Sequence, residues 1–124
     1  MDIKKVIRFL QEKEKRKKEN LHRLRRLIID KLKGTCVFEK YRVKKAFLFG
    51  SMVEGNITEL SDVDIAIVGD LDFHEFSQLF TDIESILGFE VDLWMIDDLP
   101  FKNDILKKGM KIYERKDTDF NEQY

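Results

Sequence analysis

Hydrophobic residues recur at helical spacing in two stretches of the first third of the chain, residues 3–10 and 21–32. Every residue between these stretches is polar or charged. The pattern predicts helix over residues 2–33, with its end at Gly34. Either one helix crosses solvent in its middle, or two helices meet near Asn20, whose side chain would cap the second. We expect the second stretch to pack on a sheet and the first on a partner or a second copy of the chain.

The rest of the chain alternates apolar strand-like runs with helical segments. The runs expected to form strands are residues 45–50, 62–68, 89–95 and, at a sheet edge, 110–113. Asp72 and Glu75 have the spacing of a capping box and predict a helix that ends at Gly88. Its expected core face is Phe73, Phe76, Phe80, Ile83 and Leu87. A short helix is expected over residues 101–108.

These elements predict an α/β (α+β) domain in which helices flank a mixed β-sheet. We expect an N-terminal helical extension over residues 1–34, a central domain over 35–115 and a loose tail over 116–124. The length of 124 residues leaves room for one domain of ordinary size.

Composition excludes several classes of function. Hydrophobic residues make up 43% and charged residues 38%, with a net charge of −1, so electrostatic binding of nucleic acid is not expected. Apolar runs are too short to span a membrane, and the start is too charged for a signal peptide, so we expect a cytoplasmic protein. The single Cys36 excludes an internal disulfide and a Cys-rich zinc site, and two isolated histidines exclude a His-rich metal site.

Candidate chemistry is concentrated between Gly50 and Asp64. Gly50-Ser51 closes an expected strand, where small residues allow backbone N–H groups to approach an anion such as phosphate. Asp62 and Asp64 follow in the next strand, and strand alternation directs both to one side, with Cα atoms about 7 Å apart. Two such carboxylates can hold Mg²⁺ ions, which prefer oxygen ligands.

A third carboxylate lies in the expected strand over residues 89–95. Alternation puts Asp92 on its polar side together with Glu90, which is expected to be a surface charge. If this strand pairs with the strand over 62–68, Asp92 reaches the same metal ions. Asp62, Asp64 and Asp92 are therefore the candidate catalytic and metal-binding residues, because three neighbouring acids repel one another unless a cation holds them.

Gly50-Ser51, a gap of ten residues and Asp62-x-Asp64 resemble the signature of the DNA polymerase β-like nucleotidyltransferases. The flanking residues look most like the minimal nucleotidyltransferase (MNT) family of prokaryotes. The resemblance implies the nucleotidyltransferase fold, with Gly50 and Ser51 binding the phosphates of ATP or another nucleoside triphosphate. It also implies two Mg²⁺ ions held by Asp62, Asp64 and Asp92. Where many relatives have an arginine, this chain has Glu54.

The resemblance leaves three functions open. In the first, the chain transfers a nucleoside monophosphate, expected to be AMP, to a hydroxyl of a partner protein. Small relatives of this kind are often antitoxins paired with a helical HEPN-type toxin. In the second, the chain is a catalytically weak module that neutralises its partner by docking alone. In the third, it is a stand-alone enzyme that modifies a small hydroxylated molecule. A homodimer is a further possible assembly.

Overall fold

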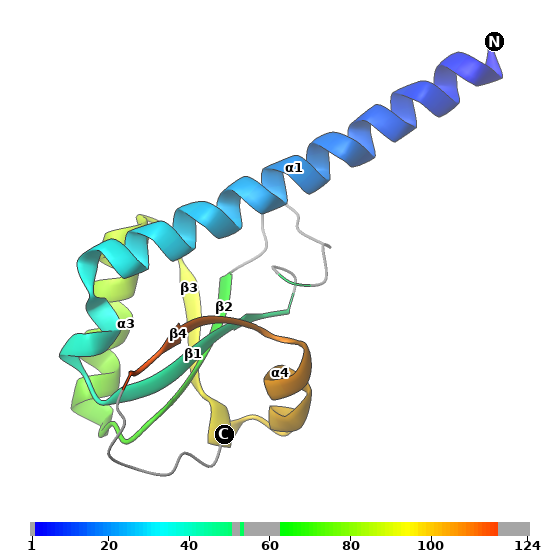
Figure 1. Cartoon of the computed structure of the whole chain (residues 1–124). Helices are drawn as coiled ribbons and strands as arrows, with labels where there is room; N and C mark the ends of the chain where they lie inside the picture. Colours follow the sequence, from blue (N-terminus) through cyan, green and yellow to red (C-terminus); the bar gives the residue numbers. More distant parts are fainter. Residues whose placement is uncertain (1, 51–52, 54–62, 117–124) are drawn as a thin grey trace.

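The computed structural model describes residues 2–50, 53 and 63–116 (Figure 1). In chain order the elements are α1 (Ile3–Thr35), the 3-10 helix η1 (Val37–Lys40), β1 (Val43–Phe49), β2 (Val63–Gly69), α3 (Phe73–Leu87), β3 (Val91–Met95), the 3-10 helix η2 (Ile96–Asp98), α4 (Lys102–Lys108) and β4 (Met110–Glu114). Ser51, Asp62 and the segment that separates them lie outside the described residues, apart from Val53, as does the expected tail beyond residue 116.

The N-terminal segment is one continuous helix of 33 residues, so the single-helix alternative holds. The prediction that it ends at Gly34 is wrong, because Gly34 is still helical. The helix ends at Cys36, which adopts the left-handed conformation with φ 53° and donates its N–H to the Lys33 carbonyl. The Thr35 hydroxyl donates to the Lys31 carbonyl at 3.0 Å. Together these two bonds satisfy carbonyl groups in the last turn of α1, although no glycine occupies the left-handed position.

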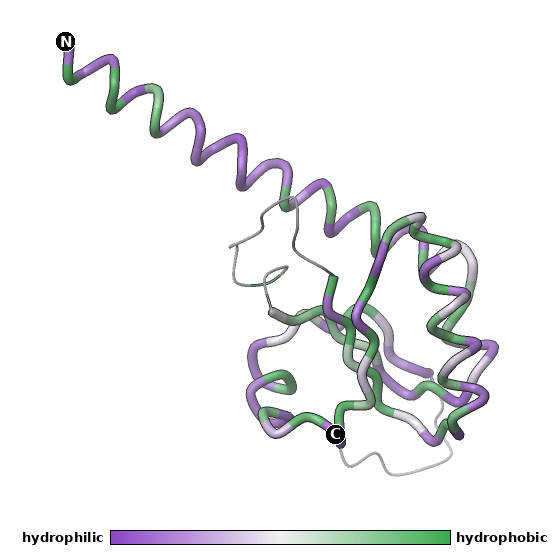
Figure 2. Tube along the Cα trace, turned by 180° about the vertical axis from the view of Figure 1, so that it is seen from behind, coloured by the Kyte–Doolittle hydropathy of each residue, from purple (hydrophilic) through white to green (hydrophobic). Residues whose placement is uncertain are grey.

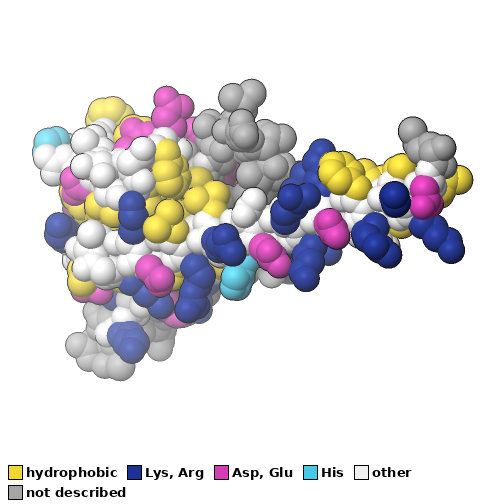
Figure 3. Space-filling model, turned by 90° about the horizontal axis from the view of Figure 1, so that it is seen from above, with side chains coloured by type: hydrophobic (Ala, Val, Ile, Leu, Met, Phe, Trp, Pro, Cys, Tyr) yellow, Lys and Arg dark blue, Asp and Glu magenta, His cyan; other side chains and the backbone are white. Residues whose placement is uncertain are grey.

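The two apolar stretches of α1 have different surroundings. Ile28 and Leu32 are fully buried against the domain, whereas Ile3 is 71% exposed and Leu10 is 53% exposed. Figures 1 and 2 show the N-terminal half of α1 projecting beyond the domain, and Figure 2 colours its middle turns as hydrophilic. Viewed from above, Lys and Arg side chains line this projecting part, with hydrophobic side chains near its tip (Figure 3). The polar middle therefore crosses solvent, as the first alternative predicted.

The sheet has four strands in the order β3-β2-β1-β4. β1 pairs antiparallel with both β2 and β4, while β2 pairs parallel with β3. The expected mixed sheet and the expected edge position of β4 are therefore confirmed. Within the described ranges, no helix combines the length and the apolar composition that a membrane span requires.

Two hydrophobic clusters lie on opposite faces of the sheet. The larger cluster lies on the face that is covered by α1, η1 and α3. Its strand residues are Val43, Ala46, Leu48, Val63, Ile65, Ile67, Val91, Leu93 and Ile112. The smaller cluster joins η2 and α4 to the other face through Phe47, Ala66, Val68, Ile96, Leu99 and Ile105. Because alternate residues of β2 enter the two clusters, this strand is apolar over most of its length.

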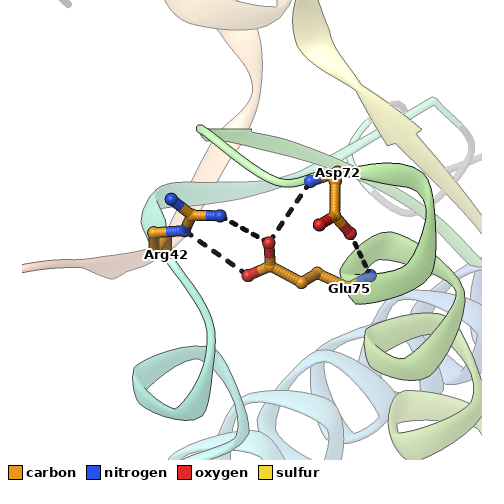
Figure 4. A network of polar contacts seen from close by, with 3 residues as sticks. All are labelled: Arg42, Asp72 and Glu75. Atoms are coloured by element: carbon orange, nitrogen blue, oxygen red, sulfur yellow. Dashed lines mark hydrogen bonds and ion pairs between the residues drawn. The ribbon is translucent and has the colours of Figure 1, made fainter.

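Helix α3 begins with the predicted capping box. Asp72 accepts from the Glu75 N–H at 2.8 Å, the Glu75 side chain accepts from the Asp72 N–H, and Arg42 pairs with Glu75 at 2.5 Å (Figure 4). Gly88 ends the helix in the left-handed conformation, as predicted. The prediction that Phe73 belongs to the core is wrong, since it is 85% exposed.

The exposure of Phe73 follows from the helical rotation. The buried positions of α3 are Leu79, Ile83 and Leu87. At about 100° per residue, position 73 lies roughly 80° from the centre of this buried line. Phe76 and Phe80 lie closer to it and are partly buried against the larger cluster. The predicted core face was therefore shifted toward the flank of the helix.

Candidate active site

Two of the three candidate carboxylates are neighbours in the sheet. Asp64 of β2 is the direct register partner of Asp92 of β3, so the expected pairing of these strands is present. Register partners in adjacent strands point to the same face and lie about 4.8 Å apart along the pairing direction. The residues that follow them, Ile65 and Leu93, point to the opposite face and are buried under the helices. Asp64 and Asp92 are only half-buried.

Gly50 adjoins one member of this pair, Asp64. Asp64 is also the register partner of Phe49, the last residue of β1, and Gly50 follows with φ 68°. A Cβ atom at position 50 would lie 2.6 Å from Oδ2 of Asp64, which is closer than van der Waals contact allows. The missing side chain therefore provides the space that the Asp64 carboxylate occupies. Sequence reasoning explained the glycine at position 50 by the approach of an anion to the backbone. The structure adds a second reason for a glycine there, which is the position of the Asp64 carboxylate.

Val53 is hydrogen-bonded to α1 by a residue that sequence reasoning missed. The Val53 N–H donates to the Gly50 carbonyl at 3.0 Å, and Arg25 donates from its guanidinium to the Val53 carbonyl at 3.2 Å. Positions 21, 25, 28 and 32 follow the spacing of one helix face. An arginine that interrupts this otherwise apolar stripe is the signal that could have identified Arg25.

A cavity of about 510 Å³ lies beside Gly50, a size typical of small-molecule sites. Helix α4 forms its far wall, which sequence reasoning had not connected with the site. Lys108 brings a positive charge to this wall and Asp104 a negative one. The lining residues are Phe49, Gly50, Val53, Phe101, Asp104, Ile105, Lys108 and Gly109.

Buried Lys45 belongs to the opposite end of β1 from Gly50. It is 7% exposed, and its Nζ lies 3.7 Å from Oε1 of Glu114 on the paired strand β4. Lys111 also contacts Glu114, and together these cations lower the pKa of the Glu114 carboxyl. The Lys45–Glu114 ion pair therefore joins β1 to β4, away from the candidate carboxylates.

The donor atoms that the structure brings together suit a hard divalent cation. Asp64 and Asp92 contribute carboxylate oxygens from adjacent strands on a half-open face, and Mg²⁺ prefers such ligands. In residues 2–50, 53 and 63–116, no group of three His, Cys, Asp or Glu residues is placed to hold a metal. Asp62, the third expected ligand, and Ser51 lie outside those ranges, so their roles stay predictions.

Comparison with known families decides the class of this protein. Residues 31–118 match the family model described as "Polymerase beta, Nucleotidyltransferase". The chain belongs to this nucleotidyltransferase family. The match includes the whole sheet, both candidate carboxylates of the described strands and Gly50. It begins within the last turns of α1, so the projecting part of that helix lies outside it.

Individual relatives support the same assignment. A Methanocaldococcus jannaschii protein, "Putative protein adenylyltransferase MJ1379", is 39% identical over 77 residues, which are 59% of this nucleotidyltransferase and 75% of the relative. The solved structure of a "putative minimal nucleotidyltransferase" superposes with a TM-score of 0.61 at 20% identity, covering 70% of this chain and 93% of that one. A toxin-antitoxin structure with AMP-PNP gives 0.56 at 22% identity, covering 70% and 75%. At these identities the two structures support the fold.

Proposed function

We propose that this nucleotidyltransferase transfers AMP from ATP to a hydroxyl group of a partner protein. The observation that carries the proposal is the arrangement at one end of the sheet. Asp64 faces the same side as Asp92 on the adjacent strand, and its carboxylate lies against Gly50. Predicted phosphate-binding and metal-binding groups from three segments of the chain thus meet at one half-open place. The cavity beside Gly50 provides adjoining space for a nucleotide.

Each candidate residue has a distinct role in the proposed reaction. Gly50 and Ser51 hold the triphosphate, while Asp62, Asp64 and Asp92 hold two Mg²⁺ ions. When bound, those ions supply Lewis-acid stabilisation of the charge that develops on the phosphate oxygens. Asp92 accepts the proton of the acceptor hydroxyl. The acceptor oxygen then forms a bond to the α-phosphorus of ATP, and the bond between that phosphorus and the bridging oxygen to the β-phosphate breaks. Pyrophosphate leaves with this oxygen.

Two positive groups support nucleotide binding despite Glu54. Arg25 donates to the backbone at Val53, three residues beyond Gly50, and Lys108 lines the cavity beside Gly50. We infer that these residues offset the acidic side chain at position 54, because triphosphate binding needs positive charge nearby. The two basic residues therefore come from two different helices, α1 and α4.

The proposed biological role is that of an antitoxin that modifies a helical HEPN-type partner. The name of the Methanocaldococcus relative supports protein adenylylation, and the toxin-antitoxin structure with AMP-PNP supports the nucleotide and the kind of assembly. The exposed apolar stretch of α1 offers a contact surface for this partner or for a second copy of the chain. Deletion of residues 1–12 is expected to weaken that association and to leave the domain folded.

A labelling experiment tests the proposed reaction. The purified chain, its co-expressed helical partner, Mg²⁺ and ATP labelled at the α-phosphate are expected to yield a labelled partner. Asp64→Asn and Asp92→Asn are expected to reduce labelling by about 10²–10³-fold, because each removes a charge that stabilises the transition state. Glu90→Gln, which removes an exposed acid just before β3, is the matched control and should label normally.

Each alternative function has its own outcome. Tight association without labelling, unchanged by Asp64→Asn, would indicate a module that acts by docking. Label recovered only in small molecules, without any partner present, would indicate a stand-alone enzyme. Either result would overturn the proposed protein adenylylation.

A further inference from the structure

A groove of about 440 Å³ runs along the outer edge of β3, between this strand and α3. Its helix side is formed by one aromatic face, to which Phe73, Phe76 and Phe80 contribute. Its strand side includes Asp92 and Trp94, which share the face of the candidate active site. The groove is therefore continuous with a candidate catalytic carboxylate.

The groove exposes side chains that are costly to leave in water. Phe73 is 85% exposed and Trp94 is 42% exposed, and both line the groove. Large apolar side chains that gather in one exposed place mark interaction sites, and aromatic residues dominate the binding energy of such sites. Charged residues of the groove lining are limited to Asp92 among the described residues.

The two edge strands of the sheet differ in how they are protected. At the β4 edge, the pairing with β1 is irregular, and Lys111 and Glu114 form an ion pair on the strand. Charged side chains and bulges are the usual means of preventing a further strand from pairing. The sequence of β3, Val-Asp-Leu-Trp-Met, has no lysine, and its pairing with β2 is regular. The β3 edge, whose one charged residue is Asp92, is therefore less protected than the β4 edge.

Backbone groups of β3 face outward along the groove. The Val91 N–H donates to the Glu84 side chain at 3.1 Å rather than to β2. Because the outward direction of strand backbone groups alternates, Leu93 directs its N–H and C=O to the same side as Val91. In the described part of the chain, β2 is the only strand beside β3. Leu93 is therefore positioned to pair with an extended segment.

We propose that this groove binds an extended segment of the acceptor protein, which adds to the sheet beside β3. The inference rests on the proposed function and specifies the side from which the acceptor reaches the site. Strand addition uses main-chain hydrogen bonds for affinity and pockets for alternate side chains for specificity. Apolar residues of the segment pack against Phe76 and Phe80, and the residues between them lie on the face of Asp92. The hydroxyl to be modified belongs to this second set or directly follows the segment.

Variants of the exposed aromatic residues test the groove. Phe73→Ser and Trp94→Ala are each expected to raise the Kd for the purified partner by about tenfold or more, measured by calorimetry without ATP in the Asp92→Asn background, where transfer is strongly reduced. In the active background, the same variants should raise the KM for the partner while the KM for ATP stays unchanged. Leu27→Ala, which removes an apolar side chain that is 44% exposed on α1, is the matched control.

Hydrogen exchange of the intact complex tests the strand pairing. Partner binding is expected to slow exchange of the Leu93 amide. Unchanged binding of the Phe73→Ser and Trp94→Ala variants, or unchanged exchange at Leu93, would overturn the groove even if labelling succeeds. Protection of Leu93 that depends on chain concentration without partner would show a second copy in the groove and would also overturn it. Failure of labelling with groove-dependent binding would instead overturn only the proposed reaction.

Discussion

The two faces of the sheet carry out different tasks with residues that alternate along the same strands. On the face covered by α1 and α3, Ile65, Ile67 and Leu48 are fully buried. On the other face, Asp64 and Asp92 occupy half-buried positions, and Gly50 lies against the Asp64 carboxylate. Helix α4 and η2 cover the remainder of this second face through a smaller cluster. Stability is therefore concentrated on one side and candidate chemistry on the other.

This division explains how charged groups are placed inside an apolar strand. A buried carboxylate without a partner is strongly unfavourable, so the acids lie at half-buried positions outside the smaller cluster. The covered face supplies the hydrophobic stabilisation that holds β2 beside β3 in the register that joins Asp64 to Asp92. Substitutions on the two faces should therefore separate folding from activity.

The largest expected effect comes from two adjacent residues of β2 on opposite faces. Ile65→Ala is expected to lower the free energy of unfolding by about 2–5 kcal/mol, because it leaves a cavity in the fully buried cluster. Asp64→Asn is expected to change this free energy little, because it keeps the side-chain shape and removes one of two neighbouring negative charges. Chemical denaturation measures both variants.

Labelling activity completes that comparison. Ile65→Ala should retain normal activity per folded molecule at low temperature, whereas Asp64→Asn should lose it. A large loss of stability in Asp64→Asn would mean that the half-open face also holds the fold together, contrary to the division described above.

A smaller effect is expected from two glycines with similar backbone conformations. Gly50 has φ 68° and Gly88 has φ 78°, so alanine at either position should cost about 1–2 kcal/mol of stability. Only at Gly50 would the new methyl group displace the Asp64 carboxylate, because nothing lies within 4 Å of the corresponding position at Gly88. Gly50→Ala should therefore reduce labelling strongly, and Gly88→Ala should leave it unchanged. Equal activities would show that the Asp64 carboxylate can move without loss.

The next prediction concerns the hydrogen bond by which α1, on the covered face, contacts Val53 near the candidate site. Arg25→Gln removes the guanidinium that donates to the Val53 carbonyl and is expected to raise the KM for ATP by about tenfold, equal to about 1.4 kcal/mol. Arg26→Gln, at the adjacent exposed position, is the control. The prediction fails if both variants have the same KM for ATP in the labelling assay.

The smallest expected effect is a pH dependence of the free energy of unfolding, caused by a hydrogen bond on the covered side of the sheet. The Tyr41 hydroxyl donates to Asp82 at 2.6 Å, and burial together with this carboxylate raises the pKa of Tyr41 to about 12. Because this exceeds its ordinary value of 10, the native state binds the proton more tightly than the unfolded state. The stabilisation by this hydrogen bond, about 1 kcal/mol, is complete below pH 10 and is lost between pH 10 and 12.

Comparison of Tyr41→Phe with the unchanged chain measures this contribution. The difference in free energy of unfolding should be constant from pH 7 to 9 and should fall above pH 10, while labelling at pH 8 stays the same. A difference that persists at pH 12 would contradict the assignment of this bond.

Much of the fold could be predicted because hydrophobic residues recur at clear helical or strand spacing along the chain. The strand containing Asp64 and the helix after Asp72 follow directly from alternation and from a capping box. The end of α1 was missed because Cys36 adopts a left-handed conformation that its residue type does not signal. Phe73 was misplaced because residue type alone does not show which flank of a helix the sheet covers.

The candidate site could be predicted only as a set of residues. The spacing of Gly50 and Asp64 identifies the motif, and the identity of Asp92 follows from its position in the next strand. The contact between Gly50 and the Asp64 carboxylate depends on the register of β1 against β2, which the residue pattern does not define. Arg25 and Lys108 come from helices outside the motif, so only tertiary structure connects them with it.

The projecting helix has a consequence for hydrodynamic measurements. A helix of 33 residues is about 50 Å long, and its N-terminal half adds length but little mass to a 14.8 kDa chain. Such a tapered shape increases the frictional coefficient, so a single copy should elute from a sizing column ahead of a spherical protein of the same mass. Sedimentation equilibrium, which is independent of shape, is therefore the method that would distinguish an elongated monomer from a dimer.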